Sequence, residues 1–347
     1  MTTKLKNIFI SFGFLALFFI SNFSRPVHAY DPQDFVTRWK TDVTGATEPT
    51  KVTLNFQKVS GTAYYQVSWK CDNNYETIFD AKYTYDYGIA GTYDICIKSP
   101  LTPLAFYAPG LASDEKAKLQ EIKQWGSIKW SSFNTAFASM TNMKLTATDI
   151  PDLSAVTDMS SAFENTNFAG NESMNGWNTS NVVNMNRLFR NSTKFNSPIG
   201  NWNTSNVTNM AEMFYLASTF NQDITNWNLE NVTTTSNMFY RALKFNNGAA
   251  AGTSNRPLTW KTGNVKNLSG MFRAAVSFNQ PIGSWNTTNV ANMERVFDGA
   301  SVFNQALSNW NTSQVTTMLA MFQNAYAFNQ NLNHFNTANV KDMNSMF

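Results

Sequence analysis

The chain has 347 residues and a formal net charge of +3, from 26 basic and 23 acidic residues. Three of the basic residues (Lys4, Lys6 and Arg25) and none of the acidic ones fall in residues 1–29, so the rest of the chain is close to neutral. Binding to nucleic acid rests on clustered Lys and Arg, and we therefore expect no nucleic-acid partner.

The first 29 residues have the pattern of a secretory signal peptide. Lys4 and Lys6 give a basic start, and residues 8–20 form an apolar run. A signal-peptide core has about 7–15 residues, whereas a membrane span, the alternative interpretation, needs about 20. Val27 and Ala29 place small residues at the −3 and −1 positions of a cleavage site. We expect cleavage after Ala29, a secreted or cell-surface protein, and no transmembrane span in the mature chain.

Residues 30–108 are expected to form a small antiparallel β-domain. Apolar and polar residues alternate in 51–59 and 65–69, and 83–87 and 91–98 have the pattern of a strand pair around a glycine-containing turn. This pair, with its Tyr-Gly-Ile-Ala-Gly-Thr-Tyr sequence, resembles the final strands of PKD-like domains. The resemblance implies an immunoglobulin-like β-sandwich.

The β-domain contains both cysteines of the chain, Cys71 and Cys96. Disulfides form and persist in oxidising compartments, which an exported chain enters. The two residues are therefore a candidate disulfide, which requires that their side chains face each other in the fold.

Residues 109–130 are expected to connect the β-domain to the repeats and to cap the first copy. Pro109 and Gly110 are typical of a linker. Ser113 is a suitable N-cap residue, and the two acidic residues that follow it would lie at the positive end of a helix dipole. A short capping helix is predicted there.

Residues 131–347 contain a repeat of about 25 residues. The aromatic residue that marks each copy recurs at this spacing, apart from an eight-residue insertion within 247–257. The consensus reads Trp-Asn-Thr-Ser-Asn-Val-Thr-Asn-Met, then Met-Phe, then Phe-Asn-Gln-x-Ile. About eight copies are present, and the last is incomplete. The markers are Trp177, Trp202, Trp227, Trp260, Trp285, Trp310 and Phe335.

Each copy is too small to bury its own apolar face. From Val207 to Ala217 the apolar residues recur every three or four positions, which indicates a short helix, and Phe-Asn-Gln-x-Ile indicates a short strand. Stacked copies would bury these faces against one another. The expected fold is a β-sandwich followed by an α/β leucine-rich-repeat-like solenoid of short strands and short helices. Asn203 and Asn206 would bond neighbouring backbone groups.

The array resembles the BspA-like leucine-rich-repeat surface proteins, whose copies contain the same Trp-Asn-Thr-Ser-Asn-Val-Thr-Asn-Met and Phe-Asn-Gln segments. The resemblance covers residues from about 113 to 347. It implies a bacterial surface or secreted protein with an adhesive role. Partners of such a protein would be protein or glycan ligands on a host, a neighbouring cell or the matrix.

The sequence offers few residues for chemistry. His334 is the one histidine outside the expected signal peptide, and no metal-ligand cluster or glycine-rich phosphate loop occurs. The acidic residues of the repeats do not recur as pairs in register, as a glycosidase would need. Asp72, Glu76 and Asp80 do not have the spacing of an EF-hand. We expect no catalytic, cofactor-binding or metal-binding residue, and no enzyme.

Function is expected to reside where the copies differ. Tyr215, Tyr240 and Tyr326 interrupt the consensus and are candidates for a ligand surface, as is the insertion within 247–257. The repeated Trp and Phe residues are better explained as core. Two alternatives to adhesion are an accessory module of a carbohydrate-active enzyme and a purely structural surface spacer.

The sequence stops at Met346-Phe347, within a copy, and shows no C-terminal cap, sorting motif or anchor. We expect either a truncated reading frame or a last copy that frays or pairs with another chain.

Overall fold

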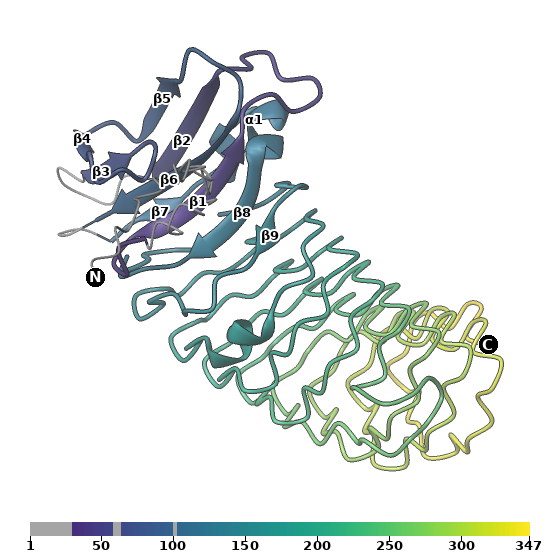
Figure 1. Ribbon diagram of the computed structural model, residues 1–347. Helices are drawn as coiled ribbons and strands as arrows, with labels where there is room; N and C mark the ends of the chain where they lie inside the picture. The colour runs from purple at the N-terminus through teal and green to yellow at the C-terminus, as the bar shows by residue number, and fades with distance from the viewer. Residues whose placement is uncertain (1–29, 58–63, 100–102) are drawn as a thin grey trace, which may run out of the picture. The chain divides into compact units, whose positions relative to one another are not determined.

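The computed structural model describes residues 30–57, 64–99 and 103–347. Two β-sheets are built from the first part of this range, and a long series of coils follows (Figure 1). The expected signal peptide and its cleavage site lie outside the described residues. No helix in the described part of the chain is long and apolar enough to cross a membrane.

The larger sheet has the strand order β4-β3-β6-β1-β8-β9 and the smaller one β5-β2-β7. Neighbouring strands are antiparallel except for the parallel pair of β8 and β9. The larger sheet consists of β1 (Phe35–Lys40), β3 (Tyr65–Ser68), β4 (Glu76–Ile78), β6 (Thr92–Lys98), β8 (Leu119–Gln124) and β9 (Lys144–Leu145). The smaller sheet consists of β2 (Lys51–Gln57), β5 (Lys82–Asp86) and β7 (Ala105–Phe106).

The two sheets share an apolar core. β2 contributes Leu54 and β6 contributes Ile95 and Ile97, all fully buried. Two sheets over a common core, antiparallel apart from the β8–β9 pair, are compatible with the sandwich part of the expected fold. The larger sheet also includes β8 and β9, which come after residue 108 in the chain.

A disulfide joins Cys71, after β3, to Cys96 in β6. Their Cα atoms are 5.0 Å apart, within the normal range for a disulfide. The bridge fixes the turn that follows β3 against the larger sheet.

A 3-10 helix, η1 (Ala108–Gly110), and a short helix, α1 (Ser113–Lys118), lie between β7 and β8. Ala112 is the N-cap of α1. The fully buried Lys118 ammonium contacts the Glu115 carboxylate and donates to the carbonyl oxygens of Glu48 and Lys51, at 2.9 and 3.0 Å. These bonds satisfy a buried charge and fix α1 to the segment that enters β2.

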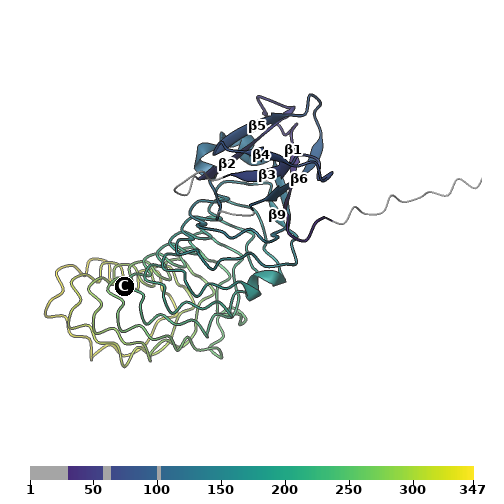
Figure 2. The same ribbon diagram turned by 90° about the vertical axis from the view of Figure 1, so that its left-hand side faces the viewer.

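The expectation of short strands and short helices in every repeat is wrong. From residue 146 to 347 all residues are described, and the regular element among them is one 3-10 helix, η2 (Glu172–Gly176). Each copy instead forms a coil of turns that contributes a single parallel β-bridge to each neighbour (Figures 1 and 2). We call residues 131–347 the coil stack; it is not an α/β leucine-rich-repeat-like solenoid.

Backbone hydrogen bonds between coils replace the expected helix. Glu212 and Leu216 have φ angles of 57° and 59°, in the left-handed region, which interrupts helical bonding every four residues. The N–H groups of Glu212 and Phe214 donate instead to carbonyl oxygens of the next coil, at 2.8 and 2.9 Å. Left-handed backbone costs a non-glycine residue roughly 1–2 kcal/mol. The bonds between coils offset this cost, and the same turns direct a side chain inward every three or four residues.

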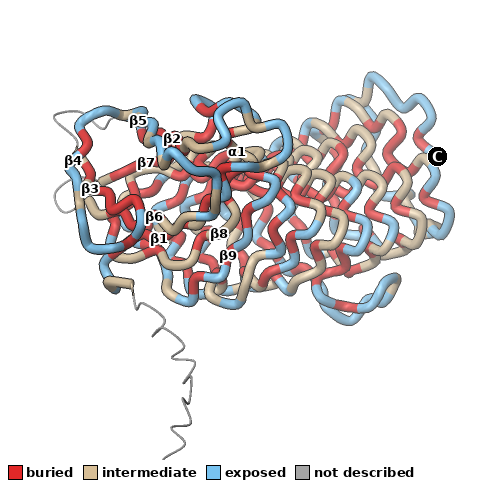
Figure 3. The backbone as a smooth tube through the Cα atoms, turned by 45° about the horizontal axis from the view of Figure 1, so that its top comes forward, coloured by how far each residue is buried: buried red, intermediate tan, exposed pale blue. Residues whose placement is uncertain are grey.

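Aromatic ladders fill the interior of the coil stack, so buried residues recur along every coil (Figure 3). Phe214, for example, stacks on Phe189 and Phe239 with ring centroids 5.7 and 5.4 Å apart. A second phenylalanine ladder and a tryptophan ladder run beside it. The three ladders include Phe163, Phe189, Phe214, Phe239, Phe272, Phe297 and Phe322; Phe195, Phe220, Phe245, Phe278 and Phe303; and Trp260, Trp285 and Trp310.

Asparagine side chains satisfy the backbone of each turn. The Asn203 carboxamide oxygen accepts from the Ser205 N–H at 3.0 Å, and the Asn206 carboxamide donates to the Ser180 carbonyl of the preceding coil at 2.7 Å. In the Phe-Asn-Gln segments, each asparagine oxygen accepts from the backbone N–H of the asparagine in the next coil. This ladder joins Asn196, Asn221, Asn246, Asn279, Asn304 and Asn329.

Candidate functional site

The structure brings two of the three candidate tyrosines together. Tyr215 and Tyr240 occupy the same position in consecutive coils, and their rings stack with centroids 4.5 Å apart and an interplanar angle of 24°. The Arg190 guanidinium lies over the Tyr215 ring at 4.9 Å, and that of Arg273 lies over the Tyr240 ring at 5.2 Å. Arg190, Tyr215, Tyr240 and Arg273 therefore form one continuous stacked row.

The arginines of this row are paired with carboxylates. Arg190 bonds Glu164 at 2.8 Å and Glu212 at 2.9 Å, and Arg273 bonds Asp298 at 2.9 Å. Each tyrosine ring has a neighbour on both of its faces. A sugar or another ring therefore cannot stack on these tyrosines without displacing an arginine, and only their edges and hydroxyl groups face solvent.

Tyr326 lies apart from this pair. It is 83% exposed and occupies the repeat position of Ser218, three residues beyond that of Tyr215. Its hydroxyl group is 3.3 Å from the Asn324 side-chain oxygen. The three tyrosines do not form one continuous surface.

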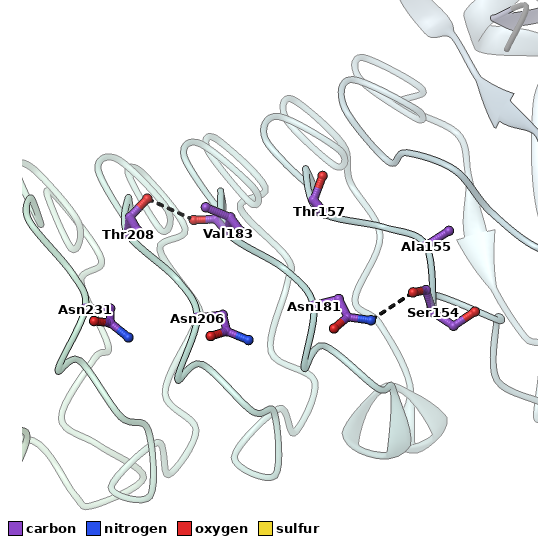
Figure 4. Close-up of a pocket in the computed structure, with 8 residues that line it drawn as sticks. All are labelled: Ser154, Ala155, Thr157, Asn181, Val183, Asn206, Thr208 and Asn231. Carbon is purple, nitrogen blue, oxygen red and sulfur yellow. Dashed lines mark hydrogen bonds between the residues drawn. The ribbon is translucent and has the colours of Figure 1, made fainter. Parts of the chain in front are cut away.

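An open hollow of about 560 Å³ runs across the first coils at a different repeat position. In Figure 4, Asn181, Asn206 and Asn231 form a row, one from each coil, and Thr157, Val183 and Thr208 form a second row beside it. We call this hollow the asparagine groove. Its lining consists of Ser154, Ala155, Thr157, Asn181, Val183, Asn206, Thr208 and Asn231, and none of these residues is ionisable.

The asparagines of the groove are held by the neighbouring coils. Each carboxamide nitrogen donates to a backbone carbonyl of the preceding coil: Asn181 to Ser154 at 2.8 Å, Asn206 to Ser180 at 2.7 Å, and Asn231 to Ser205 at 2.7 Å. Within the described part of the chain, no hydrogen bond reaches their carboxamide oxygens. The groove thus presents fixed acceptors at the spacing of the coils, next to threonine hydroxyl groups.

The insertion within 247–257 is fixed to the coils on both sides of it. The buried Asn247 side chain accepts from the Ile224 N–H at 2.9 Å and donates to the Thr225 hydroxyl at 2.8 Å. Arg256 forms an ion pair with Asp223 at 2.8 Å, and the Gly252 N–H donates to Ser277 of the following coil at 3.0 Å. The insertion contributes no residue to the asparagine groove.

The residues considered for chemistry have structural contacts. His334 Nε2 lies 2.9 Å from the Leu307 carbonyl oxygen, at a site that corresponds to the tryptophan N–H bonds of earlier coils. The Asp72 carboxylate accepts from the Ser68 hydroxyl at 2.9 Å, and this bond keeps the pKa of Asp72 below its ordinary value. Across the described residues there is no group of three or more His, Cys, Asp and Glu side chains arranged to hold a metal ion.

Two stretches of the chain, residues 131–251 and 249–347, match the family described as "Mycoplasma protein of unknown function, DUF285". Together the two matches span the coil stack, which is more than half of the chain. The chain belongs to this family. The comparisons with curated proteins and with solved structures each found no match. The family description contains no function, and it does not confirm the resemblance to the BspA-like surface proteins.

Proposed function

We propose that this DUF285 protein is an exported, non-catalytic adhesin that binds a neutral, linear glycan along the asparagine groove. The observation that carries the proposal is the row of fixed carboxamide oxygens that no other residue in the described chain bonds. Sugar hydroxyl groups would donate to these oxygens and to the Thr208 hydroxyl, whose own proton is donated to the Val183 carbonyl at 3.3 Å. A linear polymer that lies along the row would meet an asparagine oxygen in each of three coils.

The composition of the groove favours a glycan over the other ligand classes. No lining residue is charged, so the groove provides no electrostatic attraction for a polyanion or a basic peptide. An extended peptide is usually recognised through pockets for alternate side chains. The apolar side chains of the lining are those of Ala155 and Val183, which offer little to such a peptide.

Export is supported by two features that lie far apart in the chain. The first 29 residues have the pattern of a signal peptide, and the Cys71–Cys96 disulfide suits an oxidising compartment. The resemblance to BspA-like surface proteins, and that of the β-domain to PKD-like domains, supports a surface role by association.

The proposed binding to the asparagine groove is tested by filling the groove with lysine side chains, which other coils carry at the same repeat position. Val183 and Thr208 occupy a repeat position at which later coils have Lys266 and Lys341, so the double variant V183K/T208K should fold normally. Calorimetric titration of residues 30–347 with cellohexaose and chitohexaose should give saturable binding of at least one. The double variant should weaken it by about tenfold or more, which corresponds to roughly 1.4 kcal/mol.

The matched control is A291K, which places the same side chain at the same repeat position outside the groove. It should bind as the unmodified protein does. Equal loss in A291K and V183K/T208K would place the ligand elsewhere, and no binding of any neutral oligosaccharide would favour the structural spacer.

A further inference from the structure

A second hollow, of about 600 Å³, lies beside the turn that follows Trp260 and shares no residue with the asparagine groove. Lys261 and Gly263 line it, together with Glu230 of the preceding coil and Asn286 of the following one. The chain reads Trp-Lys-Thr-Gly at this turn, where the repeat consensus reads Trp-Asn-Thr-Ser. The hollow therefore lies where one coil departs from the others.

The Gly263 N–H lacks the acceptor that the corresponding N–H has in other coils. In six coils, an asparagine at the position of Lys261 accepts a hydrogen bond from the N–H two residues later, at 2.9 to 3.1 Å. A lysine side chain has no acceptor atom, and no described residue accepts from the Gly263 N–H. The six asparagines are Asn178, Asn203, Asn228, Asn286, Asn311 and Asn336.

This N–H belongs to a partly exposed residue in the lining of the hollow, so a ligand can reach it. The Lys261 side chain is 71% exposed and its ammonium pairs with the Glu230 carboxylate at 3.2 Å. An acidic ligand would meet Glu230, and an ammonium group would meet Lys261. A neutral group with an acceptor oxygen avoids both repulsions and suits the free N–H best.

We propose that this hollow binds the acetamido group of an N-acetylated sugar, whose carbonyl oxygen accepts from the Gly263 N–H. An acetamido group has the same amide carbonyl as the asparagine side chain of the other coils, so it restores the missing hydrogen bond. Asn264 also lines the hollow, and its nitrogen donates to the Glu230 carbonyl at 2.7 Å. The Asn264 side-chain oxygen, to which no described residue donates, accepts from the acetamido N–H.

The choice of a sugar as the carrier of this group rests on the proposed function, and the hollow adds a preference for N-acetylated sugars. Asn264 occupies the repeat position of Asn231, which lines the asparagine groove one coil earlier. A glycan chain that continues past Asn231 would therefore reach the hollow at the next coil.

Substitutions of Lys261 test the proposal with a side chain that other coils already carry. K261N restores the asparagine, whose oxygen would take the Gly263 N–H, and should lower the affinity for an N-acetylated sugar about tenfold or more. K261A removes the ammonium but leaves the N–H free, so it should bind nearly as well as the unmodified protein. K266N is the matched control, because it makes the same change on the same coil outside the hollow.

Saturation-transfer NMR of residues 30–347 measures binding of the methyl glycosides of N-acetylglucosamine and N-acetylgalactosamine. The methyl glycosides of glucose and galactose are the arms without an acetamido group, and the tripeptide Gly-Asn-Gly is the peptide arm. At least one N-acetylated glycoside should show saturable transfer that K261N lowers, and the corresponding plain glycoside should bind more weakly. In protein labelled with ¹⁵N-glycine, the signal that is absent from G263S should shift during the titration.

Equal loss in K261A and K261N, equal binding of plain and N-acetylated glycosides, tighter binding of the tripeptide, or no saturable transfer would overturn the proposal. Loss of hexasaccharide binding in V183K/T208K with no shift of the Gly263 signal would also overturn it, and would leave the proposed function standing. A shift of the Gly263 signal without hexasaccharide binding in the groove would support the hollow and remove the groove. Melting temperatures identify a variant that fails to fold, and the Gly263 signal of the unmodified protein then decides.

Discussion

The tryptophan N–H groups connect each coil to the one before it. Trp202 Nε1 donates to the Met174 carbonyl at 2.7 Å, and later tryptophans make the same bond. Trp177 occupies the same position, but its buried Nε1 has no hydrogen-bond partner within the described residues. Stacking alone therefore holds the Trp177 indole, whereas stacking and a hydrogen bond hold the others. The later donors are Trp227, Trp260, Trp285 and Trp310.

This difference gives a paired prediction at the scale of single residues. W177F and W202F remove similar ring volume, but W202F also removes a hydrogen bond to the Met174 carbonyl, which keeps the bond from the Trp177 N–H at 3.2 Å. A typical hydrogen bond contributes about 0.5–1.5 kcal/mol net, so W202F should be less stable than W177F by about that amount. Urea denaturation measures both. Equal loss in the two variants would mean that the indole hydrogen bond contributes nothing to stability.

At the scale of elements, the repeat spacing predicted the position of each coil but not its conformation. Rings such as Phe214 and Phe239 stack because each coil places them at the same point, so a 25-residue spacing is enough to predict the ladders. The predicted helix was wrong because turns with a left-handed residue every four positions give the same inward spacing of apolar side chains. Sequence periodicity reports which side chains are buried and not which carbonyl accepts each N–H.

Leu216 distinguishes the two conformations directly. In a helix interior, glycine is about 1 kcal/mol less stable than alanine. At a left-handed position the order reverses, since glycine avoids a strain of roughly 1–2 kcal/mol. With the Leu216 φ angle at 59°, L216G should be more stable than L216A. Thermal unfolding of the two variants provides the measurement. Greater stability of L216A would indicate that Leu216 lies in a helix instead.

The candidate sites differ in how far the sequence could reveal them. Tyr215 and Tyr240 share a repeat position, so their proximity follows from the alignment of copies, and the same alignment separates Tyr326 from them. The asparagine groove also had a signal in the sequence: an asparagine recurs in the copies two residues before an exposed position, as in Asn206 and Thr208.

At the scale of the whole molecule, we expect low pH to destabilise the β-domain more than the coils. A side-chain bond from Ser68 lowers the pKa of Asp72, one from Thr50 lowers that of Asp86, and a backbone bond from Thr47 lowers that of Asp114. Burial acts in the opposite direction and raises the pKa of Asp34. In the coils, hydrogen bonds from Ser154 likewise lower the pKa of Asp152, but most of the corresponding turns use asparagines, which do not titrate.

A lowered pKa in the folded state gives stability that is present above the unfolded value and is lost as the pH falls through the folded value. The three carboxyl groups should therefore lose their contribution below about pH 4, the unperturbed value for aspartate. Asp34 has the opposite sign, and its protonation partly offsets the loss. Hydrogen exchange at pH 7 and pH 3 should show protection falling first in β1 to β6. An earlier loss in residues 150–320 would contradict this order.

The proposal that the chain is exported leads to a separate prediction for the whole chain. Expressed with its first 29 residues in a bacterium that secretes proteins, the chain should be recovered outside the cytoplasm with Tyr30 as its first residue. Intact-mass analysis checks the cleavage site. Retention of the complete chain in the cytoplasm would remove the basis for a surface role.

The most direct test of glycan binding uses the side-chain amides of the asparagine groove. In a sample of residues 30–347 with ¹⁵N-labelled asparagine, single-residue variants would assign the carboxamide signals of Asn181, Asn206 and Asn231. Titration with the neutral hexasaccharide that binds in calorimetry should shift these three signals together, with little change at Asn289 and Asn339, which occupy the same repeat position in later coils. Shifts of equal size in all five, or none in the first three, would contradict a glycan site in the asparagine groove.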